Sequence, residues 1–263
     1  MNFTFNGMSA SEDTPSLVLI HGAGGSHLDW PIPWRNITAA PAEGHSQDTG
    51  QGGHVLQGFP VYAIDLPGHG DSGGDSLDTI DAYAQRVVTF LEENDIKNAC
   101  LAGHSMGAAV AANTCLLDPS RVGSLCLVGG GAKIGVSQDL LDGLAKATEA
   151  TVAAISRACW HKSTLPMFRE VVRRRMLASG TQTLINDFTA CSTVDLRSRL
   201  SEIAVPTLLV AAQEDRMVPM KDIEAMATSL QKPTVKTLEG CGHFLHFEKS
   251  DDIAKLLAEF LSA

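Results

Sequence analysis

The sequence predicts an α/β protein with a mostly parallel, doubly wound sheet. Short runs of β-branched and aliphatic residues alternate along the chain with segments of helical periodicity. Apolar residues make up 44% of the chain and charged residues 19%, which is typical of a globular domain. Such alternation favours parallel strands with helices on both faces. The expected strands are residues 17–20, 61–64, 99–102, 124–128, 207–211 and 234–238.

Two helices are expected from apolar residues that recur at helical spacing. The first runs from Ile80 to Leu91 behind the capping candidates Asp78 and Thr79, and the second covers residues 253–260. Residues 137–204 carry consecutive helical patterns and no convincing strand. Because this segment separates two predicted strands, we expect a helical cap, or lid, at the carboxyl edge of a core formed by residues 1–136 and 205–263. Residues 36–58 are expected to form a polar loop.

Charge and composition exclude several classes of partner. The formal charge of −10 argues against nucleic acid and against anionic membrane surfaces, because both require basic patches. No apolar run approaches the roughly 20 residues that cross a bilayer, and the N-terminus has no signal-peptide pattern. We therefore expect a cytoplasmic protein that acts on a small molecule. The sequence makes no prediction of oligomeric state.

No cofactor or metal is expected either. The six cysteines are scattered without a C-x-x-C pair, and no H-E-x-x-H motif or dinucleotide fingerprint is present. The glycines near the first strand lack the Gly-Lys-Ser/Thr ending of a phosphate-binding loop.

The motif that carries chemistry is Gly103-His104-Ser105-Met106-Gly107. It follows an apolar run and precedes small helix-forming residues, and a strand, a tight Gly-x-Ser-x-Gly turn and a helix together indicate a nucleophile elbow. The flanking glycines allow the strand and the helix to approach without Cβ clashes. Ser105 is therefore the candidate nucleophile, whereas His104 is expected to point away from it and to pack.

A serine nucleophile needs a base, and the base needs an orienting acid. Asp215 follows the predicted strand at 207–211, so its carboxylate would reach the same rim as Ser105. Glu214 would face the opposite side if the strand alternation continues. The base candidate is His243, which stands in a glycine-flanked loop after the last strand. Its rival, His246, is expected to be a rim or packing residue.

Two backbone N–H groups are expected to form an oxyanion hole. One belongs to Met106, the residue after the nucleophile. The other should come from the loop after the first core strand, where Ala23 is the first choice and Gly24 the alternative. His21 is expected to tie down this loop.

Taken together, these motifs resemble the α/β-hydrolase fold superfamily, in its branch of serine esterases, C–C hydrolases and cofactor-free haloperoxidases. The matching landmarks are His21-Gly22-Ala23-Gly24, the segment from Asp65 to Ser72, the elbow, Val205-Pro206, Asp215 and Gly242-His243. The resemblance implies a helical cap with a pocket beneath it. Ser105 disfavours the branches with an aspartate nucleophile, and His104 and Ser26 depart from the C–C hydrolase pattern.

The leading hypothesis is a serine carboxylesterase that forms an acyl-serine from a small to medium, largely apolar acyl or aryl ester. C–C hydrolase, thioesterase and lactonase are alternatives with the same triad, and a non-catalytic ligand receptor is the alternative from another class. The expected pocket residues also fit ordinary packing between cap and core. They are Gly24, Trp30 and Trp34 after the first strand, and Trp160, Met167 and Phe168 on the cap.

Overall fold

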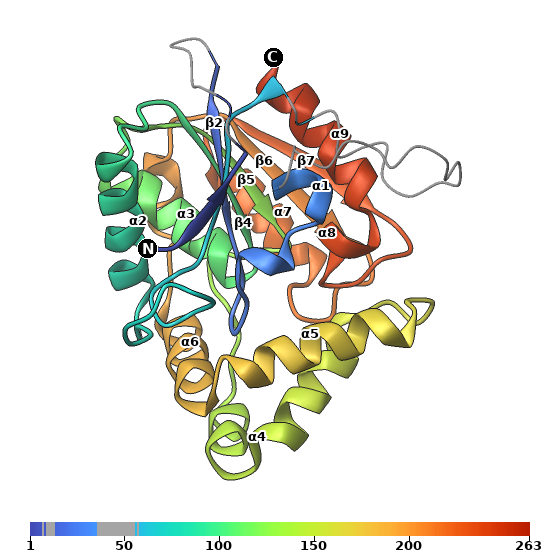
Figure 1. The fold of residues 1–263 in the computed structure, drawn as a ribbon. Coiled ribbons are helices and arrows are strands. Elements are labelled where there is room, and N and C mark those ends of the chain that lie inside the picture. The colour runs from blue at the N-terminus through green and yellow to red at the C-terminus, as the bar shows by residue number, and fades with distance from the viewer. Residues whose placement is uncertain (7, 9–13, 36–55, 57) are drawn as a thin grey trace, which may run out of the picture.

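The computed structural model describes residues 1–6, 8, 14–35, 56 and 58–263. Within these residues, seven strands form one sheet in the order β1-β3-β2-β4-β5-β6-β7. Only β1 is antiparallel to its neighbour, so the predicted α/β fold class is confirmed (Figure 1). The strands are β1 (Phe3–Phe5), β2 (Ser16–Ile20), β3 (Val61–Ile64), β4 (Ala99–His104), β5 (Val122–Val128), β6 (Thr207–Ala212) and β7 (Pro233–Leu238).

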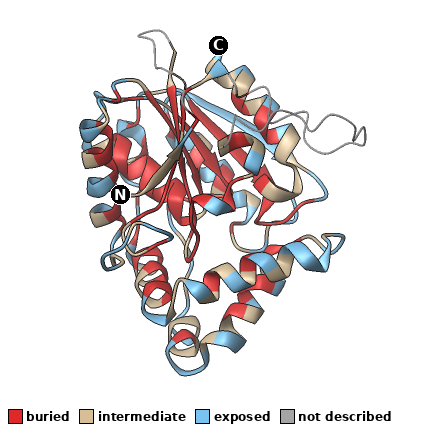
Figure 2. Ribbon diagram, viewed as in Figure 1, coloured by how far each residue is buried: buried red, intermediate tan, exposed pale blue. Residues whose placement is uncertain are grey.

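The inner strands are buried because helices cover both faces of the sheet (Figure 2). The helices α2 (Ile80–Glu93), α3 (Met106–Leu117) and α7 (Met220–Ser229) contribute to the core on one face. The other core includes residues of α1 (Ile32–Arg35), α8 (Leu245–Glu248) and α9 (Ser250–Leu261). Neighbouring strand residues alternate between the two cores, so that Leu19 belongs to one and Ile20 to the other.

Strand register brings the chemistry-bearing loops together. The β2–β4 pair runs from Ser16 opposite Ala99 to Ile20 opposite Gly103, so the glycine-rich loop after β2 lies beside the elbow after β4. In the same way, β6 and β7 pair up to Ala212 opposite Leu238, which places the loops after these two strands side by side.

Three helices occupy the segment between β5 and β6. They are α4 (Gln138–Cys159), α5 (Pro166–Ala178) and α6 (Thr181–Thr193), and Figure 1 shows them together at one end of the sheet. A separate hydrophobic cluster that includes Leu144, Val172 and Met176 holds them together. The 3₁₀ helices η1 (His27–Asp29) and η3 (Leu200–Glu202) complete the described helices. The predicted polar loop at 36–58 lies almost entirely outside the described residues.

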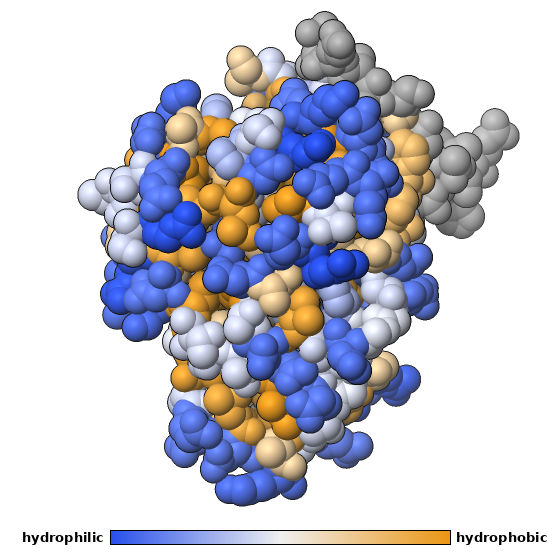
Figure 3. All heavy atoms as spheres, turned by 90° about the vertical axis from the view of Figure 1, so that its left-hand side faces the viewer, coloured by the Kyte–Doolittle hydropathy of each residue, from blue (hydrophilic) through white to orange (hydrophobic). Residues whose placement is uncertain are grey.

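The surface on the face seen in Figure 3 is a mixture of hydrophilic residues and smaller hydrophobic areas. Large exposed apolar side chains do gather around the start of α5, where Leu165, Met167, Phe168 and Val171 are all exposed. In the part of the chain that the structure describes, no helix combines the length and the apolar character that a membrane span requires.

One buried carboxylate fastens α6 to the core. Asp187 has no exposed surface, and its Oδ2 accepts hydrogen bonds from Gly24 N–H at 2.7 Å and from His69 Nε2 at 2.8 Å. Its Oδ1 accepts the Tyr83 hydroxyl at 2.6 Å. The other ring nitrogen of His69 lies 3.0 Å from the Pro67 carbonyl. Since both ring nitrogens face acceptors, His69 is positioned as an imidazolium.

The His69–Asp187 pair predicts a pH-dependent contribution to stability. Burial opposes the charge on His69, but the Asp187 carboxylate outweighs burial and raises the pKa of His69 above its ordinary value of 6.5. A raised folded-state pKa gives stability that is fully present below pH 6.5 and is lost as the pH rises through the folded-state pKa. Urea unfolding of wild type and His69→Gln should therefore show a free-energy difference that shrinks above pH 6.5.

Both proteins retain the titratable neighbours of His69, which are His21, Asp65, Tyr83 and Asp187, so the comparison reports the effect of replacing the His69 side chain. A difference that stays constant, or that grows toward alkaline pH, would contradict the assignment of an imidazolium.

The turn between β4 and α3 leaves no room for additional side chains. A Cβ on Gly103 would lie 2.1 Å from the Gly107 carbonyl oxygen, and a Cβ on Gly107 would lie 2.3 Å from the Ile20 carbonyl oxygen. Both obstacles are backbone atoms, which cannot move aside as a flexible side chain can.

We therefore expect Gly107→Ala to destabilise the protein by roughly 1–3 kcal/mol or more, through overpacking. The matched control is Gly135→Ala, because a Cβ there would meet nothing within 4 Å. Thermal unfolding checks this: the melting temperature should fall for Gly107→Ala and stay near wild type for Gly135→Ala. Equal melting temperatures would refute the packing argument.

Candidate active site

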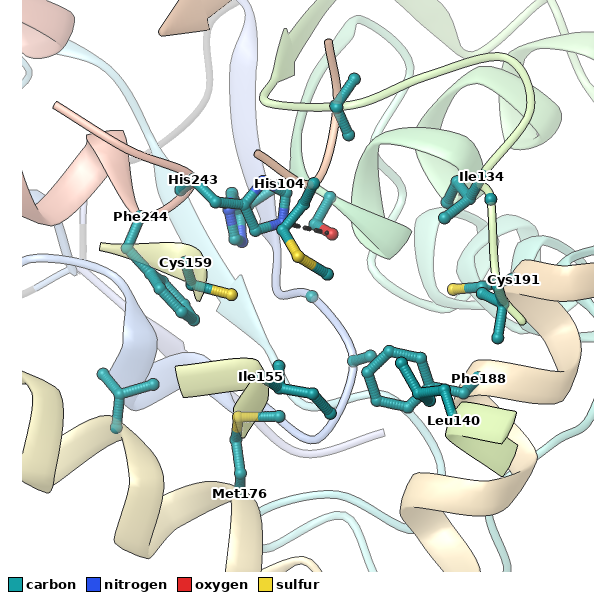
Figure 4. A pocket seen from close by; sticks show the side chains of 18 of the residues that line it. His104, Ile134, Leu140, Ile155, Cys159, Met176, Phe188, Cys191, His243 and Phe244 are labelled. Carbon is teal, nitrogen blue, oxygen red and sulfur yellow. Dashed lines mark hydrogen bonds between the residues drawn. The ribbon is translucent and has the colours of Figure 1, made fainter. Parts of the chain in front are cut away.

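Three polar side chains from remote parts of the chain meet at the carboxyl edge of the sheet. Ser105 stands between β4 and α3, Asp215 follows β6, and His243 follows β7. His243 Nε2 lies 2.9 Å from Ser105 Oγ, and His243 Nδ1 lies 2.8 Å from Asp215 Oδ2. Figure 4 labels His243, and a dashed line marks this hydrogen bond to the hydroxyl oxygen. The structure thus brings together the three side chains that the sequence predicts as a triad.

Hydrogen bonds fix the orientation of the Asp215 carboxylate and the tautomer of the His243 imidazole. Asp215 Oδ1 accepts the N–H groups of Met217 at 2.7 Å and Val218 at 3.0 Å, which leaves Oδ2 for the imidazole. An ionised carboxylate can only accept, so His243 Nδ1 carries the hydrogen and Nε2 presents its lone pair to Ser105. Glu214 instead accepts the Gly240 N–H at 3.1 Å, away from the triad.

Ser105 has the strained backbone of a sharp strand-to-helix turn. Its φ of 54° and ψ of −117° lie outside the regions that non-glycine residues ordinarily occupy. The surrounding ladder holds this conformation, because the Ser105 N–H donates to the Val128 carbonyl at 3.0 Å and the Ser105 carbonyl accepts from Ala108 N–H at 3.0 Å. Ser105 is half-buried at the rim, and its hydroxyl lies within hydrogen-bond distance of the His243 imidazole.

The loop after β2 supplies a backbone amide to the same rim. The Gly22 carbonyl accepts from Gly25 N–H at 3.1 Å and from His21 Nδ1 at 2.8 Å. Because C=O and N–H of one trans peptide point in opposite directions, the Ala23 N–H faces away from those donors. Ala23 lines the pocket beside Ser105, whereas the Gly24 N–H is already bound to Asp187. This geometry favours Ala23 over Gly24.

The second amide belongs to Met106, the first residue of α3. The first N–H groups of a helix have no partner within it and carry the positive end of the helix dipole. Met106 therefore places a donor next to the nucleophile without any side chain being required.

The histidines around the triad are uncharged. Burial, helped by the charge on His69, lowers the pKa of His21 to about 4, and its Nε2 accepts the Leu66 N–H. Burial and the nearby His243 lower the pKa of His246 to about 3. Burial likewise holds the pKa of His104 well below its usual range. His104 packs between the rings of His243 and His246, as expected from the sequence.

An apolar pocket lies between the triad and the three helices that follow β5. Figure 4 shows His243 on one side of it and Ile155, Met176 and Phe188 on the other. Its apolar wall includes Leu140 and Ile155 of α4, Val172 and Met176 of α5, and Phe188 and Cys191 of α6.

Charge is nearly absent from the pocket lining. Among the described residues that line it, Asp29 is the single carboxylate, and none is a lysine or an arginine. Burial raises the pKa of Asp29, although Arg175 Nη1 lies 3.0 Å from its Oδ1. Elsewhere in the described chain, no group of three or more His, Cys, Asp or Glu side chains is arranged to hold a metal ion.

The structure corrects the predicted pocket residues that follow β2. Trp30 and Trp34 stack on each other at 5.6 Å inside the sheet core, and Trp30 also contacts the His246 ring. They do not line the pocket, because both side chains are buried in the hydrophobic core of that face of the sheet. Gly24 is also excluded from the lining, since Leu184 lies over it.

The pocket residues expected in the predicted cap segment, residues 137–204, need the same correction. Trp160 stacks on Phe244 at 4.7 Å and borders a separate hollow together with Phe168. Met167 is 64% exposed and Phe168 is 46% exposed. Helix α5 begins at Pro166, and it is the next turns, with Val172 and Met176 four residues apart, that face the pocket. That i, i+4 spacing was the available signal for the wall residues that sequence reasoning missed.

The chain is similar to known hydrolases in both sequence and structure. A 2-hydroxy-6-oxononadienedioate/2-hydroxy-6-oxononatrienedioate hydrolase of Paraburkholderia phymatum is 29% identical over 279 residues, covering 98% of this chain and 90% of that one. The solved structure of a thermophilic esterase is 26% identical, with a TM-score of 0.79 over 94% of this chain and 89% of that one.

An enol-lactonase from Burkholderia xenovorans LB400 is 18% identical with a TM-score of 0.85, covering 100% of this chain and 96% of that one, and this likeness shows the fold. The sequence profile of the Alpha/beta hydrolase family matches residues 17–256. The triad geometry, the fold and this match lead to one conclusion: the chain belongs to the Alpha/beta hydrolase family.

Proposed function

We propose that the protein is a serine hydrolase that cleaves carboxylic esters of small to medium, largely apolar acyl or aryl groups. The observation that carries this proposal is the chain of hydrogen bonds from Asp215 through His243 to Ser105, with Ser105 and His243 lining an apolar pocket. The proposal goes beyond family membership in naming the bond that is cleaved.

These hydrogen bonds account for both half-reactions. His243 Nε2 takes the Ser105 proton as Oγ attacks the ester carbonyl, and the resulting imidazolium is stabilised by Asp215. The tetrahedral intermediate collapses, the alcohol leaves with the proton from His243, and an acyl-serine remains. Water then attacks the acyl carbon, His243 removes its proton, and the acid is released with Ser105 regenerated.

Negative charge develops on the carbonyl oxygen in both steps. The proposed donors for this oxygen are the N–H groups of Ala23, in the loop after β2 that lines the pocket, and of Met106, at the start of α3. Fixed donors stabilise the transition state without having to reorganise, and losing one such donor typically costs about 10²–10³-fold in kcat.

The pocket favours neutral substrates. A carboxylate placed against the apolar wall would lose its hydration and find no lysine or arginine among the lining residues. The name of the Paraburkholderia relative specifies a dienedioate, which carries two carboxylates. The apolar lining supports an uncharged ester for this chain.

Cleavage of a C–C bond or of a lactone is the second candidate. It is supported by the names of the relatives, a dienedioate hydrolase and an enol-lactonase. The same serine, imidazole and amide donors serve these reactions, so the difference lies in the substrate that the pocket accepts.

We expect Ser105→Ala to lower kcat for p-nitrophenyl butyrate by roughly 10⁴-fold or more, because the nucleophile is removed. Ser120→Ala is the matched control, since Ser120 lies exposed on the surface. A fluorophosphonate probe should label wild type and the control at Ser105, and it should leave Ser105→Ala unlabelled. Turnover by Ser105→Ala at the wild-type rate would remove this mechanism.

A matched pair of substrates tests the preference for neutral acyl groups. We expect kcat/KM for p-nitrophenyl butyrate to exceed that for the p-nitrophenyl monoester of succinate by at least about 100-fold, because the second acid must lose its hydration. Equal or faster turnover of the charged ester would contradict the pocket argument. A vinylogous 1,5-diketone and an enol-lactone complete the panel, and turnover of either well above every ester would reassign the reaction.

A further inference from the structure

We propose that Asp187, on α6, is a positioning residue that sets the geometry of the oxyanion hole from outside the pocket. The proposal rests on the proposed function, since it concerns the stabilisation of the oxyanion. Asp187 is fully buried and is absent from the pocket lining, so it acts on the substrate only through the backbone that it holds.

The loop after β2 is held at two successive peptide units. The first, between Gly22 and Ala23, is fixed through the Gly22 carbonyl by His21 and Gly25. The second, between Ala23 and Gly24, is fixed through the Gly24 N–H by Asp187 Oδ2 at 2.7 Å. Together the two anchors determine the backbone dihedrals of Ala23, and with them the direction of its N–H.

The Gly24 N–H is held by the Asp187 carboxylate, and this carboxylate is held in turn by two further hydrogen bonds. Asp187 Oδ2 also accepts from His69 Nε2, and Oδ1 accepts from the Tyr83 hydroxyl. Hydrogen bonds to a carboxylate are shorter and stronger than neutral ones, and this carboxylate is shielded from water. The acceptor for Gly24 therefore has little freedom to move.

Helix α6 contacts the same glycine a second time. A Cβ on Gly24 would lie 2.5 Å from Leu184 Cδ2, so the Leu184 side chain rests directly against the loop. Gly24 also has a φ of 63°, which favours glycine at this position. These contacts couple the seating of α6 to the position of the Ala23 amide.

The coupling should affect the transition state more than substrate binding. The Ala23 N–H matters most when charge develops on the carbonyl oxygen, whereas the apolar wall binds the acyl group in either state. A loosened loop therefore lowers kcat and leaves KM nearly unchanged. A defect in cap packing would instead change KM or the melting temperature.

The test compares Asp187→Asn with Asn186→Ala. Asn186 is the adjacent residue of α6 and bonds the core at Ser76, away from the loop, so its loss removes a contact between α6 and the core that does not involve Gly24. We expect Asp187→Asn to lower kcat for p-nitrophenyl butyrate at least 10-fold, up to the roughly 10²–10³-fold expected for a lost donor, with KM within about twofold. Asn186→Ala should keep kcat within about twofold of wild type.

A second readout separates positioning from general damage. A trifluoromethyl ketone adds to Ser105 and places an oxyanion in the hole, whereas the matching methyl ketone binds mainly through the apolar pocket. Affinity for the trifluoromethyl ketone should fall in Asp187→Asn by about the same factor as kcat/KM, and affinity for the methyl ketone should not change. Equal losses for both ketones, or an unchanged kcat in a folded Asp187→Asn, would overturn the proposal.

The single variant leaves His69 without its counterion and can fail to fold. The double variant His69→Gln, Asp187→Asn removes both charges, and the same kinetic and ketone results are expected from it. The proposed function fails separately: it is refuted if wild type hydrolyses no ester and the probe does not label Ser105. An active wild type whose folded Asp187 variants match it refutes only the positioning role.

Discussion

The contact between His243 Nε2 and Ser105 Oγ, 2.9 Å long, is the interaction on which the rest of the structure depends. It requires a serine backbone in a strained conformation, and that conformation requires the sheet ladder on one side and two glycines without Cβ atoms on the other. Strand register supplies the remaining partners, because β2, β4, β6 and β7 all deliver their following loops to one edge. The site thus forms because parallel strands place the loops that follow them at the same edge of the sheet.

The three triad residues can be predicted from the sequence because each stands in or next to a short local motif. The elbow combines a strand, a turn and a helix within a few residues, and Asp215 and His243 each directly follow a recognisable apolar strand. The six predicted strands are recognisable for the same reason, because each is a short local apolar run, and their observed ends differ from the predicted ends by two residues at most. β1 escaped prediction, because a three-residue run with Thr between two Phe residues is too short to be told from a loop.

The pocket could not be predicted in the same way. Its wall depends on which turn of each helix faces the sheet, and this is decided by packing among α4, α5 and α6 rather than by residue type. Met167 and Phe168, near the start of α5, are predicted to line the pocket but are exposed, while Val172 and Met176 face the cavity. The link between Asp187 and Gly24 spans 163 residues of sequence, so no local pattern reveals it. The residues that form the pocket wall are therefore determined by tertiary packing, whereas the candidate catalytic residues stand in short sequence motifs.

The most direct measurement is a crystal structure of the protein after reaction with a p-nitrophenyl alkylphosphonate. The account predicts phosphorus bonded to Ser105 Oγ, the phosphoryl oxygen within hydrogen-bond distance of the Ala23 and Met106 N–H groups, and the alkyl chain against the wall formed by Ile155, Val172 and Met176. A phosphoryl oxygen that points away from both amides, or a His243 ring turned away from the adduct, would contradict it.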